Sequence, residues 1–364
     1  MNDFTAKRRI SRAIRVGDVM IGGGAPVSIQ SMTNTDPLCY DETKAQAEAL
    51  AAAGCQIVRL AVPNMASVET VRRLKREIPH IPLVADIHFD YKLALAAINA
   101  GIDKIRINPG NIGDAARVRA VADACRERGI PIRIGVNSGS LEKEILAKYG
   151  APTPDALAES ALYHASLLED CGFSDIAVSI KASNVPDMIA ANRILAAKTS
   201  YPLHLGVTEA GSERMGTVKS AIGIGTLLAE GIGDTIRVSL TADPVREIEA
   251  AKSILSALGL LTKPGMDIIS CPTCGRTKIA LIPLLEEFEA EARRLGLLSY
   301  PVKVAFMGCV VNGPGEAREA DIGVAGGNGD GIIFRHGVPA ERVAAADIVP
   351  TLLREISKMK DGQA

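Results

Sequence analysis

The 364-residue chain contains no tryptophan, and aromatic residues make up only 3% of it. So few aromatic side chains leave little surface for stacking against bases or sugars. The formal net charge of -1 provides no electrostatic attraction to nucleic acids or anionic membranes. No run reaches the ~20 apolar residues of a membrane span, and no apolar signal-peptide core follows the basic residues near the start. These absences favour a soluble, cytoplasmic enzyme.

A disulfide framework is also not expected. The chain has seven cysteines, an odd number, and no secretory signal, which indicates a reducing compartment. Cys39 stands apart from the other cysteines. Cys55, Cys125 and Cys171 lie in or beside predicted helix ends, where a cysteine usually serves as a small buried apolar residue.

The three remaining cysteines lie near the C-terminus and carry the most specific signal. The sequence reads Cys271-Pro-Thr-Cys274 and, further on, Gly-Cys309-Val-Val-Asn-Gly-Pro-Gly. Two thiolates on a tight turn and a third on a Gly/Pro-rich loop can converge on an iron–sulfur cluster. Glycine and proline let the backbone of these loops approach the cluster closely. No fourth cysteine lies nearby, so one iron would have a weaker ligand and could meet a substrate. The pattern predicts redox chemistry.

Zinc is the alternative ligand for these cysteines. A Cys-x-x-Cys pair also occurs in zinc sites, which usually combine two such pairs or cysteine with histidine. This chain has no second Cys-x-x-Cys, and His336 is the only histidine in its last hundred residues. The residues therefore favour a cluster, and the metal content of the protein distinguishes the two.

The first ~260 residues repeat one unit of a β-branched strand, a loop and an Ala/Leu-rich helix. Glycines at the predicted helix ends, positions 54, 101, 129 and 172, are expected to form left-handed caps. Eight such units over about 240 residues fit a closed (β/α)8 TIM barrel better than an open sheet. A hairpin over 13–21 could plug the bottom of the barrel. The predicted strands are 27–33, 56–62, 82–88, 104–108, 131–137, 175–180, 203–208 and 235–240, with helices that include 41–53, 67–78 and 155–170.

The pattern changes after Leu260. We predict a long helix over 277–295, strands over 302–306, 321–325 and 331–334, and a closing helix over 340–359. The expected division is therefore a barrel, residues 1–262, and a smaller domain, residues 263–364, with the three cysteines on its loops. The fold class is α/β: a TIM barrel followed by an α+β iron–sulfur domain.

Polar side chains collect at the C-terminal ends of the predicted strands, where the active sites of TIM barrels lie. A half-buried group of cations costs several kcal/mol per ion unless an anion compensates it, and arginine binds phosphate through paired hydrogen bonds. The sequence therefore predicts a site for a diphosphate-sized anion. The cations are Arg59, Arg106, Arg133, Lys181 and Arg237, and the other polar candidates are Asp86, His88, Asn108, Asn137, Glu209 and Ser239.

Each of these residues also has a structural interpretation. A strand arginine often forms an internal ion pair, and Asp86 and Glu209 could neutralise two of the five cations. His88 could form a hydrogen bond within the core. Glu209 suits proton donation beside a redox centre or pairing with Lys181 or Arg237. Three residues could cap loops instead of touching a ligand: Asn108, Asn137 and Ser239.

The cation-lined barrel and the two cysteine motifs together resemble the 4-hydroxy-3-methylbut-2-en-1-yl diphosphate synthase family, in its bacterial two-domain form. The matching segments are Cys271-Pro-Thr-Cys274-Gly-Arg and Met307-Gly-Cys309-Val-Val-Asn-Gly-Pro-Gly-Glu316. The strand ends Val-Thr-Glu-Ala-Gly and Ile-Arg-Val-Ser-Leu also resemble the family. The resemblance covers essentially the whole chain, without the large extra domain of plant-type members.

The resemblance implies a role for each candidate residue. Cys271, Cys274 and Cys309 would hold a [4Fe–4S] cluster with Glu316 as an unusual fourth ligand, and Asn312 would lie beside the cluster. Glu209 would be the catalytic acid. The remaining residues would bind substrate: Arg59, Arg106, Arg133, Lys181, Arg237 and Ser239 as a diphosphate clamp, and Asp86, His88, Asn108 and Asn137 as supporting contacts.

The implied reaction is the two-electron reductive opening and dehydration of 2-C-methyl-D-erythritol 2,4-cyclodiphosphate to 4-hydroxy-3-methylbut-2-enyl diphosphate, a step of isoprene biosynthesis in the methylerythritol phosphate pathway. The resemblance implies flavodoxin or ferredoxin as electron donor and a homodimer. Two other readings of the residues are a phosphosugar or pterin-type barrel with structural zinc and a nucleic-acid zinc module. The low net charge and scarce aromatics count against the second.

Overall fold

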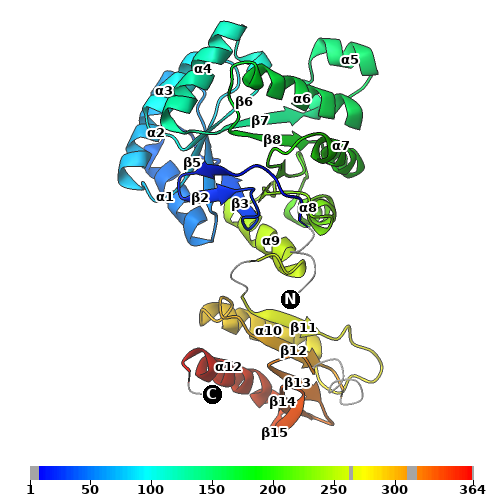
Figure 1. The fold of residues 1–364 in the computed structure, drawn as a ribbon. Helices are drawn as coiled ribbons and strands as arrows, with labels where there is room; N and C mark the ends of the chain where they lie inside the picture. The colour runs from blue at the N-terminus through cyan, green and yellow to red at the C-terminus, as the bar shows by residue number, and fades with distance from the viewer. Residues whose placement is uncertain (1–7, 262–264, 310–317, 363–364) are drawn as a thin grey trace. The chain divides into compact units, whose positions relative to one another are not determined.

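The computed structural model describes residues 8–261, 265–309 and 318–362 of the chain. The chain divides into two compact units, Met1–Leu261 and Thr262–Ala364 (Figure 1). Each unit encloses a hydrophobic core of its own.

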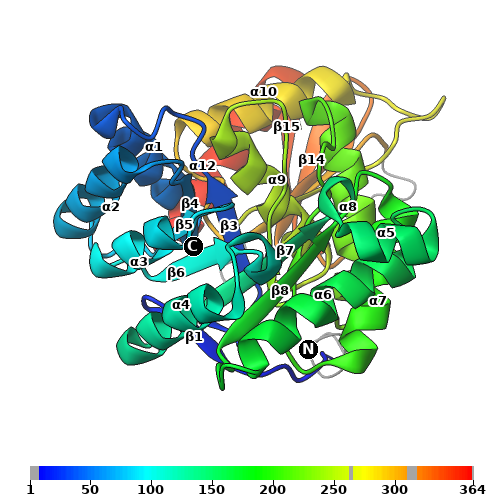
Figure 2. The same cartoon turned by 90° about the horizontal axis from the view of Figure 1, so that it is seen from above.

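The first unit is a ring of eight parallel strands with helices outside it (Figure 2). The strand order is β8-β7-β6-β5-β4-β3-β10-β9, and a parallel bridge between Val178 and Leu203 closes the ring. The predicted TIM barrel is therefore confirmed. The strands are β3 (Ser28–Met32), β4 (Ile57–Ala61), β5 (Leu83–Asp86), β6 (Lys104–Ile107), β7 (Ile132–Asn137), β8 (Ile176–Lys181), β9 (His204–Leu205) and β10 (Thr235–Ile236).

The barrel helices carry recognisable caps, and the predicted glycine ends are confirmed. Asn64 and Ser67 form a capping box at the start of α2. The glycines at positions 54, 101, 129 and 172 all have positive φ, as expected for left-handed helix ends. Among the described residues, no helix is both long and apolar enough to cross a membrane. The barrel helices are α1 (Tyr40–Ala52), α2 (Met65–Glu77), α3 (Tyr91–Asn99), α4 (Ala115–Arg128), α5 (Lys143–Tyr149), α6 (Pro154–Glu169), α7 (Val185–Lys198), α8 (Glu213–Ala229) and α9 (Pro244–Ala257).

An antiparallel hairpin of β1 (Ile14–Val16) and β2 (Val19–Ile21) closes the N-terminal end of the barrel. It turns at Gly17 and Asp18, as predicted. Its apolar side chains pack against inward-facing residues of β4, β5 and β8, so this end of the interior is apolar. The cluster consists of Ile14, Val16, Ile21, Ile57, Val84 and Ala177.

Strand side chains alternate between the helices and the barrel interior. On β6, Ile105 belongs to the core shared with the helices, so Lys104 and Arg106 face the interior. On β7, Ile132 and Ile134 belong to that core, so Arg133 between them also faces inward. Beyond the apolar floor, the interior of this barrel is therefore strongly polar.

The second unit is a five-stranded mixed sheet in the order β11-β12-β13-β14-β15. The first three strands run parallel, and β14 and β15 add antiparallel. Two helices share its hydrophobic core. The elements are β11 (Asp267–Ser270), α10 (Leu281–Arg294), β12 (Lys303–Met307), β13 (Ile322–Gly326), β14 (Asp330–Arg335), β15 (Val338–Ala344) and α12 (Ile348–Lys360).

Two helix predictions in this unit are partly wrong, and β11 and β15 were missed. Residues Val338–Ala344 pair with β14, so the predicted helix 340–359 begins only at Ile348. The alanines favour a helix locally, but the tight turn at His336 and Gly337, both with positive φ, directs the chain back along β14. The predicted helix 277–295 begins at Leu281, because Thr277 belongs to the turn that contains Cys274.

Candidate active site and cysteine loops

The five predicted cations all come from the barrel strands or the residues that follow them. Arg59, Arg106, Arg133 and Lys181 are at most 9% exposed, and Arg237 is half-buried. Electrostatic repulsion acts on Arg133 from Arg59, Arg106 and Arg237, and on Lys181 from Arg237, Arg133 and Arg59. The structure therefore brings these cations together in one interior cluster, the cation cluster.

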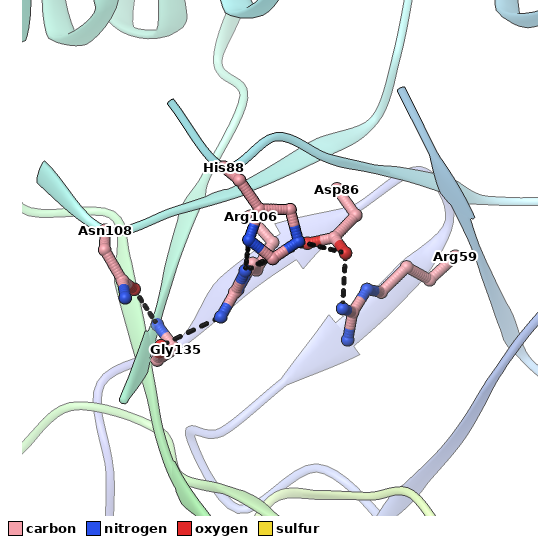
Figure 3. A network of polar contacts seen from close by, with 6 residues as sticks. All are labelled: Arg59, Asp86, His88, Arg106, Asn108 and Gly135. Atoms are coloured by element: carbon pink, nitrogen blue, oxygen red, sulfur yellow. Dashed lines mark hydrogen bonds and ion pairs between the residues drawn. The ribbon is translucent and has the colours of Figure 1, made fainter. Parts of the chain in front are cut away.

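Asp86 orients two of the cations. Its carboxylate accepts hydrogen bonds from Arg59 at 2.6 Å and from Arg106 at 3.3 Å, and it lies 3.2 Å from Nε2 of His88 (Figure 3). Burial raises the pKa of Asp86, but attraction to Arg59 and the bond to His88 outweigh burial and hold the pKa well below its usual value. The structural interpretation of a strand arginine as an internal ion-pair partner is therefore confirmed for Arg59 and Arg106.

Two glycines make room for the cations, a feature that sequence reasoning missed. Arg106 donates to the carbonyl of Gly135 at 2.9 Å, and Asn108 accepts from its N–H at 3.0 Å (Figure 3). A Cβ at Gly135 would lie 2.5 Å from Nε of Arg106. A Cβ at Gly206 would lie 2.7 Å from Nζ of Lys181. Side chains at these positions would displace the cations, so glycine there belongs to the site.

The other three cations have no partner within the described chain. No hydrogen bond or ion pair involves the side chains of Arg133, Lys181 or Arg237 in residues 8–261, 265–309 and 318–362. Burial, followed by repulsion from neighbouring arginines, lowers the pKa of Arg133 and of Lys181 well below their usual values. The same causes lower the pKa of Arg237 to about 10. This surplus of buried positive charge is the electrostatic signature of an anion site.

Two further interior groups, Lys104 and His204, were not among the candidates. They are 1% and 2% exposed, and both ring nitrogens of His204 lack a partner in the described chain. Lys104 precedes Arg106 by two residues, so strand alternation alone places both side chains on the same face. His204 lies on β9 and feels repulsion from Arg133, Lys181 and Lys104. The polar interior therefore extends below the predicted strand ends.

Glu209 lies on the loop that follows β9, with an exposed side chain. Its φ of 51° is unusual for a residue with a side chain and indicates a constrained backbone. Among the described residues, no ion pair joins Glu209 to Lys181 or Arg237, so the structural pairing considered for it is not found. Asn137 and Ser239 are half-buried at the same end of the barrel.

The cysteine loops lie at the ends of two neighbouring parallel strands. Cys271 follows β11 and Cys309 lies two residues after β12, and these strands pair from Asp267 to Ser270. The N–H of Gly308 donates to Sγ of Cys271 at 3.2 Å, and Lys278 donates to the carbonyl of Gly308 at 2.8 Å. These bonds tie the loops together.

Three features fit an iron–sulfur cluster at these loops. All seven cysteines are unpaired thiols, and Cys274 is exposed on a turn in which Thr273 has a positive φ of 62°. A Cβ at Gly308 would lie 2.9 Å from Thr277, so a larger residue would separate the loops. Backbone N–H donation to a cysteine sulfur, as at Cys271, is typical of cluster ligands.

Asn312 and Glu316 lie outside the described residues. Within the described part of the chain, no group of three or more His, Cys, Asp or Glu side chains is arranged to hold a metal ion. Elsewhere, Cys55, Cys125 and Cys171 are buried, as expected for small apolar residues, and Cys39 is exposed.

Family comparisons agree with both units. A family model described as the GcpE TIM-barrel domain matches residues 11–252, and one described as the GcpE protein C-terminal domain matches residues 267–358. The chain belongs to the GcpE family. Both halves of the resemblance drawn from the sequence, the barrel and the cysteine-bearing domain, thus fall within one family.

Curated relatives cover nearly the whole chain. It is 58% identical over 349 residues to the 4-hydroxy-3-methylbut-2-en-1-yl diphosphate synthase (flavodoxin) of Clostridium perfringens, covering 96% of this chain and 99% of the relative. It is 56% identical over 349 residues to the protein of the same name from Geobacter sulfurreducens, covering 96% and 98%. The family resemblance is confirmed.

Among solved structures, dihydropteroate synthase from Stenotrophomonas maltophilia is similar to the barrel, with a TM-score of 0.50. The alignment has 13% identity and covers 69% of this chain and 100% of that one. A likeness at this identity shows the barrel fold alone and gives no support to a pterin-type activity.

Proposed function

We propose that this chain is a 4-hydroxy-3-methylbut-2-en-1-yl diphosphate synthase, an oxidoreductase that takes electrons from flavodoxin. The observation that carries the proposal is the cation cluster, in which Arg133, Lys181 and Arg237 lack partners in the described chain. A diphosphate supplies the acceptors that these buried donors need. The identity to curated relatives over nearly the full length supports the same activity.

The reaction balances with two electrons and one proton. In 2-C-methyl-D-erythritol 2,4-cyclodiphosphate, the carbon–oxygen bond to one phosphate breaks and leaves an oxyanion. The hydroxyl on the adjacent carbon leaves as water after it receives the proton. The two electrons form the new alkene, which gives the linear 4-hydroxy-3-methylbut-2-enyl diphosphate. The phosphate group gains negative charge, which the site must stabilise.

The cation cluster provides this stabilisation. Arg133, Lys181 and Arg237 bind the diphosphate oxygens, while the carboxylate of Asp86 holds Arg59 and Arg106 in place. Because burial and hydrogen bonds hold Arg59 and Arg106 before the ligand arrives, these two guanidinium groups need little reorganisation as the phosphate oxyanion forms. Asn108, Asn137, His88 and Ser239 contribute polar contacts around the ring.

Glu209 donates the proton that the leaving hydroxyl needs. It is an exposed carboxyl on the loop after β9, at the C-terminal end of the barrel strands. Its constrained backbone holds the side chain in a defined direction. A carboxyl that can reach solvent is readily reprotonated between turnovers.

We propose that Cys271, Cys274 and Cys309 hold a [4Fe–4S] cluster, with Glu316 as the fourth ligand and Asn312 beside it. The tied loops, unpaired thiols and N–H donation to Cys271 support this assignment. When bound, the cluster supplies the two electrons, one at a time. Glu316 would hold the iron that lacks a thiolate, as a weaker ligand than cysteine.

The test is turnover by protein purified without oxygen. With the cyclic diphosphate and reduced flavodoxin, phosphorus NMR should show the ring signals replaced by those of a linear diphosphate ester. Omission of flavodoxin is the control, and ferredoxin in its place compares the two donors. Iron-replete protein that binds the cyclic diphosphate but forms no product would contradict the proposal.

We further propose a homodimer in the cytoplasm. Met215, Val218 and Ile222 lie on one face of α8 and are 49%, 46% and 55% exposed, an apolar stripe that a second copy could cover. Sedimentation of the wild type and of Ile222→Glu tests this: a dimer that dissociates in the variant agrees, and a wild-type monomer contradicts it.

The unpaired cysteines support a reducing compartment, which cell fractionation checks.

A further inference from the structure

Two lysines are buried inside the barrel without a counter-ion. Lys104 on β6 is 1% exposed, and Lys181 at the end of β8 is 6% exposed. Neither side chain forms a hydrogen bond or an ion pair within the described residues. A buried ammonium needs such partners, because water no longer solvates its charge.

The groups that face these lysines are mostly positive. The interior carboxylate of Asp86 is bonded to Arg59 and Arg106. Glu247 on α9 accepts hydrogen bonds from the Ser31 hydroxyl and from the N–H of Leu240. Its attraction raises the pKa of Lys181 slightly, whereas the pKa of Lys104 is set by burial and by repulsion from Arg133 and Arg59. The charged and titratable groups around the two lysines, by element, are Arg59 (β4), Asp86 (β5), Arg106 (β6), Arg133 (β7), His204 (β9), Arg237 (just after β10) and Glu247 (α9).

Arginine and lysine respond differently to such crowding. The guanidinium of arginine stays protonated in proteins, whereas a buried lysine readily loses its proton. Burial, and then repulsion from Arg133 and Arg59, lowers the pKa of Lys104 to about 7. Burial and repulsion from Arg237 lower the pKa of Lys181 well below its usual value. The lysines are thus the groups that relieve the charge of the ligand-free barrel.

We propose that binding of the cyclic diphosphate in the barrel is coupled to proton uptake by the two buried lysines, Lys104 and Lys181, which are neutral in the ligand-free protein. The proposal rests on the diphosphate site proposed above. A dianion among the arginines offsets part of the positive charge that repels the lysines and favours each lysine in its charged form. The site then acquires two extra ammonium donors only when its ligand is present.

Proton uptake can be counted by titration calorimetry. The holoenzyme, purified without oxygen and without reductant so that no turnover occurs, is titrated with the cyclic diphosphate in buffers of different ionisation enthalpy. Each phosphorus of this ligand carries one strongly acidic oxygen, so the ligand itself takes up no proton near neutral pH. At pH 8 we expect roughly one to two protons taken up per ligand bound. The uptake should decrease below about pH 7, where Lys104 is already protonated.

Variants assign the protons to residues. Lys104→Met should lower the uptake by up to about one proton while the ligand still binds. Lys92→Met removes an exposed lysine of α3 and should leave the uptake unchanged. His204→Gln should also leave the proton uptake unchanged. Burial and repulsion from Arg133 lower the pKa of His204 well below its usual value, so we do not expect this ring to take up the proton. Circular dichroism confirms that each variant is folded.

The outcomes separate this inference from the proposed function. Tight binding with no proton uptake at pH 8 would overturn the inference and leave the function intact. Uptake that persists in Lys104→Met but disappears in His204→Gln would also overturn it, because His204 would then be the acceptor. No binding of the cyclic diphosphate at all would instead contradict the proposed function.

Discussion

The barrel and the C-terminal unit present their functional side chains in opposite ways. In the barrel, four of the five cations lie on strands and are at most 9% exposed, and Asp86 and the glycines at 135 and 206 position three of the five. In the C-terminal unit, the cysteines lie on loops, with Cys274 exposed and Cys271 and Cys309 half-buried. Burial strengthens the electrostatic attraction between the cations and an anion. Cysteines that hold a metal must instead be reached by that metal. The comparison predicts that binding and electron supply can be disrupted separately.

The largest effect is expected from Cys274→Ser. Loss of one of three thiolate ligands should remove or convert the cluster and lower turnover by more than about a thousandfold. Binding of the cyclic diphosphate should change little, because the cation cluster belongs to the other unit. Iron and sulfide analysis with calorimetry checks both parts. Cys39→Ser, a change at an exposed cysteine of the barrel unit, is the control. Full iron content in Cys274→Ser would remove Cys274 from the ligand set.

Next in size is the effect of Glu209→Gln. The variant keeps the shape of the side chain but has no proton to donate, so kcat should fall by about 10²–10⁴ while KM changes little. Steady-state kinetics with reduced flavodoxin measures both constants. Glu48→Gln, at an exposed position on α1, is the matched control. A near-normal kcat would show that another group donates the proton.

Arg133→Ala should weaken binding while the cluster stays intact. Loss of one charge-assisted contact, worth about 1.5–3 kcal/mol, corresponds to an increase of roughly 10- to 100-fold in Kd for the cyclic diphosphate. Arg128→Ala removes an exposed arginine from α4 and should leave the affinity unchanged. If Arg133→Ala instead lost iron or unfolded, its role would be structural.

The smallest effect concerns the pH dependence of stability. In the folded protein the pKa of Lys104 is about 7, below its ordinary value of 10.5, so between these values the unfolded chain binds more protons at this site. Stability of the ligand-free protein should therefore rise with pH in this window. Between pH 7 and 9.5 the contribution is on the order of 3 kcal/mol.

Urea unfolding at pH 7 and pH 9.5 measures this dependence. Lys104→Met should lack the Lys104 contribution and be the more stable protein at pH 7, whereas Lys92→Met should follow the wild type. An identical pH dependence in wild type and Lys104→Met would show that Lys104 keeps an ordinary pKa.

Local patterns in the sequence predicted the barrel well. Strict alternation of strands and helices, glycine caps and the hairpin at Gly17 all follow from short-range rules. The inward cations could be recognised because they lie at strand ends. Lys104 and His204 lie deeper, and only consistent use of the two-residue period from Arg106 would have found Lys104.

What sequence reasoning missed depends on partners distant along the chain. Strand β15 exists because it pairs with β14 after the turn at His336, which overrides alanine-rich helix propensity. Likewise, nothing local to Gly135 reveals that Arg106 occupies the space beside its Cα. That Asp86 holds Arg59 and Arg106 but not Arg133 is also a property of the closed barrel.

The most direct test of the account is the metal content of protein purified without oxygen. Iron and acid-labile sulfide should each approach about four atoms per chain, without zinc, as a [4Fe–4S] cluster requires. Stoichiometric zinc without sulfide would contradict the account. The cysteine loops would then be a structural zinc site, and the barrel would bind its anion without a redox partner.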